Sequence, residues 1–263
     1  MKRVLVLVKS VPGDQSAGMN ADMTLNREAA SASLNLADQS AAEAAFSLGS
    51  GFSVVCMTMG PPGAASILQE LVSRGADQVL LLSGRGYAGA DTQATAYTLA
   101  QACKAFGPFD LILCGRHASD GETGQVPPML ASILGWPCIS DCVRITEDGG
   151  SVRAERSLES LSQTVEVKEP CVLSFCEYSC RLRLPCISGM KKAMYLKIPE
   201  IEPEEIGADR SRTGRKGSLT AVVRAFSPDF RKRHCRKEMD TAKAAEMILQ
   251  EVLTYGKEHG KTV

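Results

Sequence analysis

The 263-residue chain lacks a net charge at neutral pH, because 30 lysine and arginine residues balance 30 aspartate and glutamate residues. This balance argues against a general nucleic-acid-binding or membrane-surface protein. No apolar run approaches the ~18 residues that a membrane span needs. The first apolar run, Val4–Val8, is interrupted by Lys9 and falls short of the ~7 residues of a signal-peptide core. The sequence therefore predicts a cytoplasmic protein without membrane insertion, whose first segment is a buried strand.

The ten cysteines of the chain include no C-x-x-C pair. Several of them lie inside apolar runs, where a thiol behaves as a small hydrophobic group. Cys176, Cys180 and Cys186 lie near one another in the sequence, but their spacing is not that of a zinc or cluster site. We therefore expect thiols in a reducing compartment and no metal centre.

Short apolar runs alternate with helical patterns over about the first half of the chain. The apolar runs cover residues 3–9, 53–59, 78–82 and 111–114, and the helical patterns cover 35–48, 61–74, 92–106 and a segment ending at Gly135. This alternation predicts an α/β fold with a parallel, doubly wound sheet. Further strand-like runs between 138 and 177 are expected to extend the sheet, partly in antiparallel orientation.

The remaining segments have less regular patterns. Asn35 and Asp91 are expected to cap helices, and residues 15–33 to form a loop. The segment 178–197 is basic and reads as an irregular loop, and 219–226 reads as a strand within a basic run from 210 to 237. A helix is expected over 240–255, capped by Asp240 or Thr241 and ended by Gly256.

The stretch 111–135, LILCGRHASDGETGQVPPMLASILG, is the one most suggestive of a ligand. It reads as a buried strand, a glycine-containing loop and a helix with two prolines in its first turn, where a missing N–H has no cost. The backbone N–H groups of residues 123–126 would then point at an anion such as a phosphate. The loop lacks the lysine of a G-x-x-x-x-G-K-[ST] phosphate loop, so phosphate-activating chemistry is not indicated. An ordinary strand-to-helix connection remains the alternative.

In doubly wound sheets, ligands bind outside the carboxyl ends of the strands. The predicted strand ends are 7–9, 59–60 and Gly115, and the expected helix cap at Asn35 joins them. The sheet argument alone therefore predicts one crevice that is shared by these segments and by the loop after residue 115.

The segment GRHASDGETGQVPPMLASILGWP resembles the nucleotide loop of the β (small) subunit of electron-transfer flavoproteins. Further motifs agree in order with that family: VLVLVKSVP at the start, MGPP at 59–62, RGADQVLLLS at 74–83, AGADTQATAYTLA at 88–100, LPCISGMKKA at 184–193 and GSLTAVVRAFSP at 217–228. The resemblance spans nearly the whole chain. It implies a Rossmann-like, adenine-nucleotide-binding domain.

The family resemblance implies a heterodimer with a larger α subunit, which carries an electron-shuttling FAD, and electron exchange with a flavin-dependent dehydrogenase. The β site holds AMP as a structural ligand, or a second FAD in electron-bifurcating members, some of them in NADH-dependent complexes. Carried onto this chain, the cofactor contacts would be Leu7, Asn35, Leu36, Ala37, Asp38, Met59, Gly115, Arg116, His117, Asp120, Gly121, Glu122, Thr123, Gly124, Gln125 and Val126.

The resemblance also implies an organisation into two parts. Residues 1–198 would form the nucleotide-binding domain with a partner-recognition loop at 178–193, whose apolar anchor falls on Ile187. Residues 199–263 would form an arm and helix that pack on the α subunit. The chain departs from the family pattern at Leu36, where proline is usual, at His117, where glutamine is common, and at Pro127, where glycine is common.

Two other functions remain open from the residues alone. One is an adenine-nucleotide-binding structural subunit without a redox role. The other is an enzyme acting on an adenylate, against which the sequence shows no clustered nucleophile and base: His117 is the only histidine in the loop motif. A flavin relay needs no acid or base from this chain, so we expect no catalytic residue.

Overall fold

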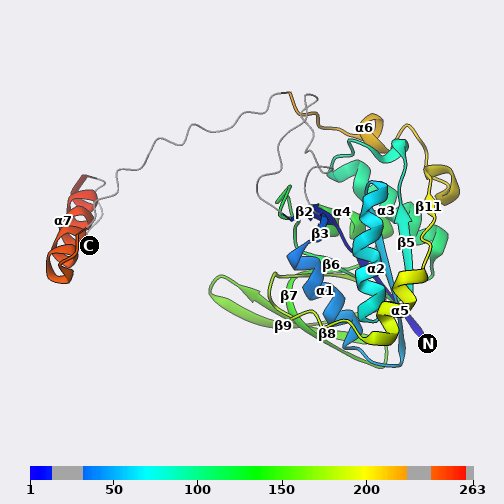
Figure 1. The fold of residues 1–263 in the computed structure, drawn as a ribbon, viewed down its shortest axis with the longest axis horizontal. Coiled ribbons are helices and arrows are strands. Elements are labelled where there is room, and N and C mark those ends of the chain that lie inside the picture. The colour runs from blue at the N-terminus through cyan, green and yellow to red at the C-terminus, as the bar shows by residue number, and fades with distance from the viewer. Residues whose placement is uncertain (14–31, 224–237, 259–263) are drawn as a thin grey trace. The chain divides into compact units, whose positions relative to one another are not determined.

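The computed structural model describes residues 1–13, 32–223 and 238–258 (Figure 1). Its contacts divide the chain into two units, Met1–Val223 and Arg224–Val263. The first unit carries the sheet and its helices, and the described part of the second carries helix α7 (Thr241–Glu258). The predicted loop over 15–33 lies mostly outside the described residues, and it is wrong at residues 32 and 33, which belong to strand β3 (Ala32–Leu34).

A nine-stranded sheet forms the centre of the first unit, in the order β11-β5-β4-β1-β6-β10-β7-β8-β9. Neighbouring strands are parallel from β11 to β7, and β8 and β9 continue the sheet in antiparallel orientation. The strands are β1 (Lys2–Leu7), β4 (Phe52–Met59), β5 (Gln78–Leu82), β6 (Leu111–Gly115), β7 (Cys138–Asp148), β8 (Ser151–Leu158), β9 (Leu161–Lys168), β10 (Cys171–Phe175) and β11 (Glu200–Ile201). The predicted doubly wound, mainly parallel sheet is confirmed.

Helices cover both faces of the sheet (Figure 1). Helices α1 (Leu36–Phe46) and α2 (Ala65–Arg74) pack on one face, and α3 (Thr92–Phe106) and α4 (Val126–Leu134) pack on the other. Along β1 the side chains alternate between the two cores: Val4 and Val6 face the first, and Leu5 and Leu7 the second. Burying each such side chain contributes roughly 1.5–3 kcal/mol. This two-sided burial explains why the inner strands are apolar throughout.

The sheet reverses its direction of growth between β1 and β6. From β1 the chain adds β4 and then β5 on one side, and after α3 it crosses back to place β6 on the other side of β1. The two strands stay paired up to Leu7 and Cys114, but the helices that follow them, α1 and α4, lie on opposite faces of the sheet. Doubly wound sheets bind ligands in the crevice outside the carboxyl ends of such a strand pair.

Gly115 allows the end of β6 to lie directly against the first turn of α1. A Cβ atom built on Gly115 would come within 2.7 Å of the Cβ of Ala37 and 2.9 Å of the backbone nitrogen of Asp38, and it would also overlap the Asp38 carboxylate. These neighbours are buried and include backbone atoms, so they have little room to move. Only glycine fits this contact.

The sequence predicted an irregular loop over 178–197. This prediction is wrong in part, because the segment contains helix α5 (Ile187–Tyr195). Cys186 caps this helix by accepting a hydrogen bond from the Gly189 amide. Gly189 lets α5 pack closely on α2, since a Cβ there would lie 2.5 Å from the carbonyl oxygen of Ser73. Serine and glycine in the first turn are weak helix formers, so the local sequence did not indicate a helix. Packing against the rest of the fold stabilises it.

Residues 199–223, which the sequence assigned to the arm, lie in the first unit. Strand β11 extends the sheet beside β5, and the short helices η3 (Pro203–Ile206) and α6 (Gly214–Gly217) both contact α3. Residues 219–223 form no strand, so the predicted strand over 219–226 is wrong in its described part; 224–226 lie outside the described residues.

Smaller elements complete the first unit. Strands β2 (Ser10–Pro12) and β3 (Ala32–Leu34) pair as a two-stranded antiparallel sheet. The short helices η1 (Pro62–Ala64) and η2 (Arg85–Tyr87) follow β4 and β5. Asp91 caps α3 as predicted, because its Oδ1 accepts a hydrogen bond from the Ala94 amide at 2.9 Å.

The second unit consists of helix α7 (Thr241–Glu258) in its described part. Asp240 caps this helix as predicted, because its Oδ1 accepts hydrogen bonds from the amides of Ala242 and Lys243. The helix continues past Gly256, so the predicted end at that residue is wrong. Its apolar side chains Ile248 and Leu249 are 65% and 56% exposed in this chain.

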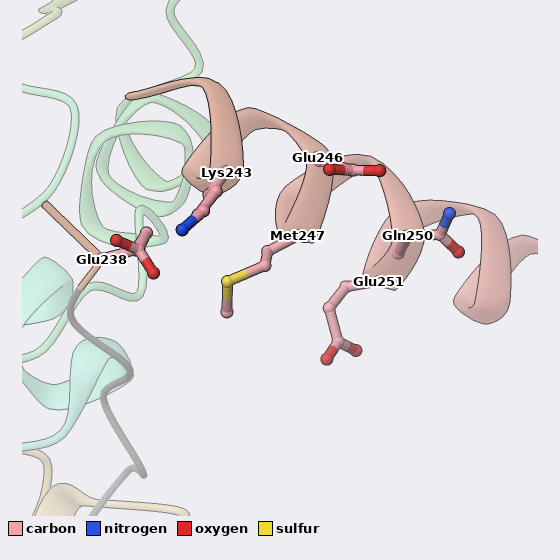
Figure 2. Close-up of a pocket in the computed structure, with 6 residues that line it drawn as sticks. All are labelled: Glu238, Lys243, Glu246, Met247, Gln250 and Glu251. Carbon is pink, nitrogen blue, oxygen red and sulfur yellow. The ribbon is translucent and has the colours of Figure 1, made fainter. Parts of the chain in front are cut away.

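A hollow beside α7 is lined by Glu238, Lys243, Glu246, Met247, Gln250 and Glu251 (Figure 2). All but Met247 are exposed, and the residues come from one helix and the segment just before it. Ligand sites are usually enclosed and apolar with a few converging polar groups. This hollow is open and lies against a single helix, so we do not treat it as a functional site. No helix in the described parts of the chain is both long enough and apolar enough to cross a membrane.

The contact at Gly115 predicts a large difference between two glycine substitutions. Gly115→Ala should lower the free energy of unfolding by about 2 kcal/mol, because the added methyl group overpacks the junction of β6 and α1. Gly121→Ala is the matched control, since a Cβ there meets nothing within 4 Å, and it should change stability by less than about 0.5 kcal/mol. Urea unfolding followed by fluorescence of Trp136, the single tryptophan, measures both. Equal stability of the two variants would contradict this interpretation.

Candidate functional site

Asp38 joins the two strand ends that flank the crevice. Its carboxylate accepts hydrogen bonds from the backbone N–H of Lys9, just beyond β1, and of Gly115, at the end of β6, both at 2.8 Å. The side chain lies in the first turn of α1 and is buried. Burial raises the pKa of Asp38 to about 7, although the two amides favour the charged carboxylate. One carboxyl group thus fixes β1, β6 and α1 relative to one another.

Asn35 is the N-cap of α1, as predicted from its position, but its side chain makes no capping hydrogen bond. Instead its Nδ2 donates to the carbonyl oxygen of His117 at 2.9 Å, and its Oδ1 accepts from the amide of Ser119 at 3.3 Å. Both of these partners belong to the loop after β6. Asn35 therefore fastens the predicted nucleotide loop to α1.

Lys9, just beyond β1, holds the same loop through its side chain. Its Nζ lies 2.6 Å from Oδ1 of Asp120, whose side chain is only 5% exposed. Such a charge-assisted hydrogen bond is stronger than a neutral one. Asp120, predicted as a cofactor contact, thus has a partner within the chain, and Lys9 contacts two acids: Asp38 through its amide and Asp120 through its side chain.

The backbone between the loop and α4 offers hydrogen-bond donors. Gly124 has φ 63°, a left-handed conformation that favours glycine, and α4 begins at Val126 with prolines in its first turn, as predicted. Within the described residues, no acceptor pairs with the amides of Thr123, Gly124 or Gln125. Val126 is the first residue of the helix, so its amide has no partner within α4. The positive end of the α4 dipole lies at the same place.

A network of charges holds the beginning of the loop to neighbouring strand ends. Arg116 Nε donates to Nδ1 of His117 at 3.2 Å, and Nε2 of His117 lies 2.9 Å from Oε1 of Glu177, which follows β10. Because Nδ1 accepts a hydrogen bond, the proton of the neutral ring is assigned to Nε2, which donates to Glu177. The Arg116 guanidinium also reaches Asp141 at 3.3 Å, and Arg156 lies on the other carboxylate oxygen of Asp141. Asp141 has φ 61° and lies where the pairing of β7 is irregular.

The structure brings several of the predicted contact residues together at the carboxyl ends of β1 and β6. Contacts join the start of α1, the end of β6 and the loop, and so bring together Asn35, Asp38, Gly115, His117 and Asp120. Met59 lies on the neighbouring strand, two residues beyond the partner of Leu7 in the register. The side chain of Leu7 is buried in the core, so only its backbone could meet a ligand.

The other predicted residues lie at the edges of this crevice. Ala37 is buried in the first turn of α1, and Leu36 beside it is 41% exposed. Gly121, Glu122, Thr123 and Gln125 are exposed along the loop. Direct contact between a cofactor and any of these residues stays a prediction.

The sequence reasoning missed the partners of the charged loop residues. Lys9, Glu177 and Asp141 are distant from the loop in sequence, and no local pattern pairs them with it. A signal was nevertheless present for Lys9 and Glu177, because each is a charged residue at or just after the end of an apolar strand. In a parallel sheet such residues meet at one edge.

Five cysteine side chains are buried in the two apolar cores: Cys56, Cys103, Cys114, Cys142 and Cys171. Burial raises the pKa of Cys103 to about 12 and the pKa of Cys114 well above its ordinary value, so both thiols stay protonated at neutral pH. In the described part of the chain, no three His, Cys, Asp or Glu side chains are placed to hold a metal ion.

A second candidate surface lies on the segment before and within α5. Leu184, Ile187, Met194 and Tyr195 are 72–82% exposed. Ile187 is the predicted apolar anchor, and its side chain projects from the first residue of α5. Exposed apolar side chains that lie close together are typical of surfaces that bind another protein. The assignment of Ile187 to a partner stays a prediction.

The chain after α6 is bound to the start of α3. Asp91 accepts hydrogen bonds through Oδ2 from the amides of Leu219 and Thr220, in addition to capping α3. The next residue, Thr92, donates from its hydroxyl to the side chain of Gln125 at the start of α4, at 2.9 Å. Residues 219–220 and the predicted nucleotide loop are therefore attached to the same helix terminus.

The raised pKa of Asp38 predicts a pH dependence of stability. Between pH 3.8, the ordinary pKa of the carboxyl group, and about pH 7, the folded chain binds one proton that the unfolded chain has released. The free energy of unfolding should therefore fall as the pH rises through this window, by about 1 kcal/mol per pH unit. Asp38→Asn should remove this contribution, so its stability should decline less steeply than that of the wild type. Urea unfolding across the window measures both slopes, and equal slopes would contradict the prediction.

Comparisons with known proteins agree with this architecture. The electron transfer flavoprotein domain matches residues 22–205. The chain is 34% identical over 230 residues to the electron transfer flavoprotein subunit beta of Thermoanaerobacterium thermosaccharolyticum, covering 86% of this chain and 88% of the relative. It is 35% identical, with the same coverage, to the caffeyl-CoA reductase-Etf complex subunit CarD of Acetobacterium woodii. It is 32% identical over 238 residues to protein FixA of Bradyrhizobium diazoefficiens, covering 86% and 83%. The chain therefore belongs to the electron transfer flavoprotein family and is similar to its β subunits.

Proposed function

We propose that this chain is the β subunit of an electron-transferring heterodimer and that its crevice binds FAD by the diphosphate. The observation that carries the proposal is the set of donors at the start of α4: the amides of residues 123–125, which have no acceptor among the described residues, and the amide of Val126. Backbone N–H groups at a helix N-terminus are suited to phosphate oxygens. They lie in the loop that Asn35 and Lys9 hold at the switch point of the sheet.

The described residues fit a phosphate-bearing cofactor in a further respect. A Cβ on Gly121 would meet no atom within 4 Å, so the loop is open at this position. FAD would supply the redox chemistry when bound. The residues of this chain would bind and orient it: the amides hold the phosphates, and the ion pairs of Lys9 and Arg116 keep the loop in place.

The exposed apolar surfaces support the proposed partners. The surface around Ile187 would contact a flavin-dependent dehydrogenase, and the arm with α7 would pack on the α subunit of the heterodimer, which carries a further FAD. With FAD in the β site as well, the heterodimer would hold the two flavins that electron-bifurcating members of the family use. A β site filled by AMP, with a structural role only, is the second candidate.

The identity of the bound nucleotide distinguishes these candidates. The full chain is co-expressed with the α subunit, the heterodimer is purified without added nucleotide, and the released nucleotides are separated and quantified. We expect two FAD molecules per heterodimer and no AMP. One FAD together with one AMP would contradict the FAD assignment and support the structural role, and a heterodimer with no nucleotide in the β subunit would contradict both.

A charge placed at Gly121 tests where the phosphates bind. Gly121→Glu puts a carboxylate in the loop without a steric clash, and its repulsion of the phosphates should weaken nucleotide binding by about tenfold. Gly121→Gln has the same shape without the charge and is the matched control, with an expected change below about threefold. Titration of the nucleotide-stripped heterodimer with AMP and with FAD gives the affinities. Equal affinities for the two variants would place the phosphates elsewhere.

A further inference from the structure

The segment that precedes Ile187 is fixed to α1 by a pair of opposite charges. Arg183 donates to Glu43 from Nη2 at 2.9 Å and from Nε at 3.0 and 3.2 Å, and its backbone amide donates to the same carboxylate at 2.9 Å. The Arg183 guanidinium also lies 5.2 Å from the centre of the Phe46 ring. A fork of this kind restricts the geometry far more than a single ion pair does.

The environment of Glu43 strengthens this contact. Its side chain is 16% exposed, compared with 41% for Arg183. Burial alone would raise the pKa of the Glu43 carboxyl, but the hydrogen bonds from Arg183 bring it below its ordinary value. The carboxylate is therefore charged at neutral pH and pairs with the arginine.

Further contacts hold the same segment to the helices. The backbone of Cys180 exchanges hydrogen bonds with the Ser40 hydroxyl, one turn before Glu43 on α1. Arg74 of α2 donates to the carbonyl oxygen of Arg183, and the amide of Cys186 donates to the carbonyl oxygen of Ser73 at 3.0 Å. Leu184 and Ile187, which flank this last contact, are 82% and 72% exposed. The backbone is thus fixed while the apolar side chains project outward.

We propose that Glu43 and Arg183 are positioning residues, which hold Leu184 and Ile187 in the orientation that a dehydrogenase partner recognises. This inference rests on the proposed function of the surface around Ile187. The physical reason is the entropy of binding: an apolar anchor on a fixed backbone loses little conformational freedom when a partner binds, whereas an anchor on a loose backbone must first be ordered. The pair itself need not touch the partner.

The loop contains its own control. Arg181 carries the same charge two residues away and is exposed, and within the described residues it has no hydrogen bond or ion pair. Arg181→Gln therefore changes the charge of the loop and leaves the contact with α1 intact. Arg183→Gln changes the charge by the same amount and also breaks the contact. Arg183→Lys keeps the charge but loses the fork, so it should give an intermediate effect.

Two measurements on the heterodimer with the α subunit test the proposal. The first is hydrogen exchange of the amides of residues 180–187, followed by mass spectrometry. The second is the KM for the heterodimer of a purified flavin-dependent dehydrogenase that reduces the wild type, with the substrate of that dehydrogenase as electron donor. Arg183→Gln and Glu43→Gln should speed exchange and raise KM about fivefold with kcat within about twofold, since ordering the anchor residues would then oppose binding. Arg181→Gln should change both quantities little.

The outcomes distinguish a failure of the positioning role from a failure of the proposed docking surface. If Arg183→Gln and Arg181→Gln give the same exchange and the same KM, the positioning role is wrong. Ile187→Ala serves as the reference for the docking surface and should raise KM about tenfold. If Ile187→Ala raises KM and Arg183→Gln does not, only the positioning role fails. If Ile187→Ala leaves KM unchanged, the docking surface assigned under the proposed function is wrong, and the positioning role fails with it.

Discussion

The candidate site depends on one buried carboxyl group. Asp38 accepts hydrogen bonds from the backbone N–H of Lys9, just beyond β1, and of Gly115, at the end of β6, and between these two strands the sheet changes direction. The Gly115 amide would otherwise be buried without a partner, at a cost of about 1–3 kcal/mol. The same contact requires glycine at position 115 and determines where the loop after β6 begins. The crevice, the loop and the first turn of α1 are therefore one structural unit.

Helix α1 connects this unit to the apolar surface before α5. Its first turn carries Asn35 and Asp38 at the crevice, and its later turns carry Ser40 and Glu43, which hold Cys180 and Arg183. The helix is rich in alanine and mostly buried, so its residues are held firmly by packing on the sheet. A rigid element with a predicted cofactor site at one end and a predicted partner surface at the other suits a protein whose task is to place a redox group at a defined distance from its partner.

Local sequence patterns predicted the sheet well and the contacts of the site less well. The alternation of apolar runs and helical patterns was sufficient for the parallel sheet, because two-sided burial leaves a strong signal in strands such as β1 and β6. The positions of Asn35 and Asp91 as helix caps were also predictable. The side-chain role of Asn35 was not, because its partners, His117 and Ser119, lie more than 80 residues later in the sequence.

Two errors have the same physical origin. Helix α5 was read as irregular because Gly189 weakens helical propensity locally, whereas in the fold that glycine permits close packing on α2. The sequence of 219–223 has the pattern of a strand. The amides of Leu219 and Thr220, however, donate hydrogen bonds to Asp91 and not to a neighbouring strand. In both cases tertiary contacts outweighed the local preference. The pairs Lys9–Asp120 and Glu43–Arg183 were likewise unpredictable from spacing, although the charges themselves were visible.

The central claim is that main-chain amides at the start of α4 bind the phosphates of an adenine-containing cofactor. A crystal structure of the heterodimer purified with its own nucleotide tests it most directly. The account predicts phosphate oxygens within hydrogen-bonding distance, about 3 Å, of the nitrogen atoms of residues 123–126. A nucleotide bound elsewhere on this chain, or a crevice filled by protein side chains, would contradict it.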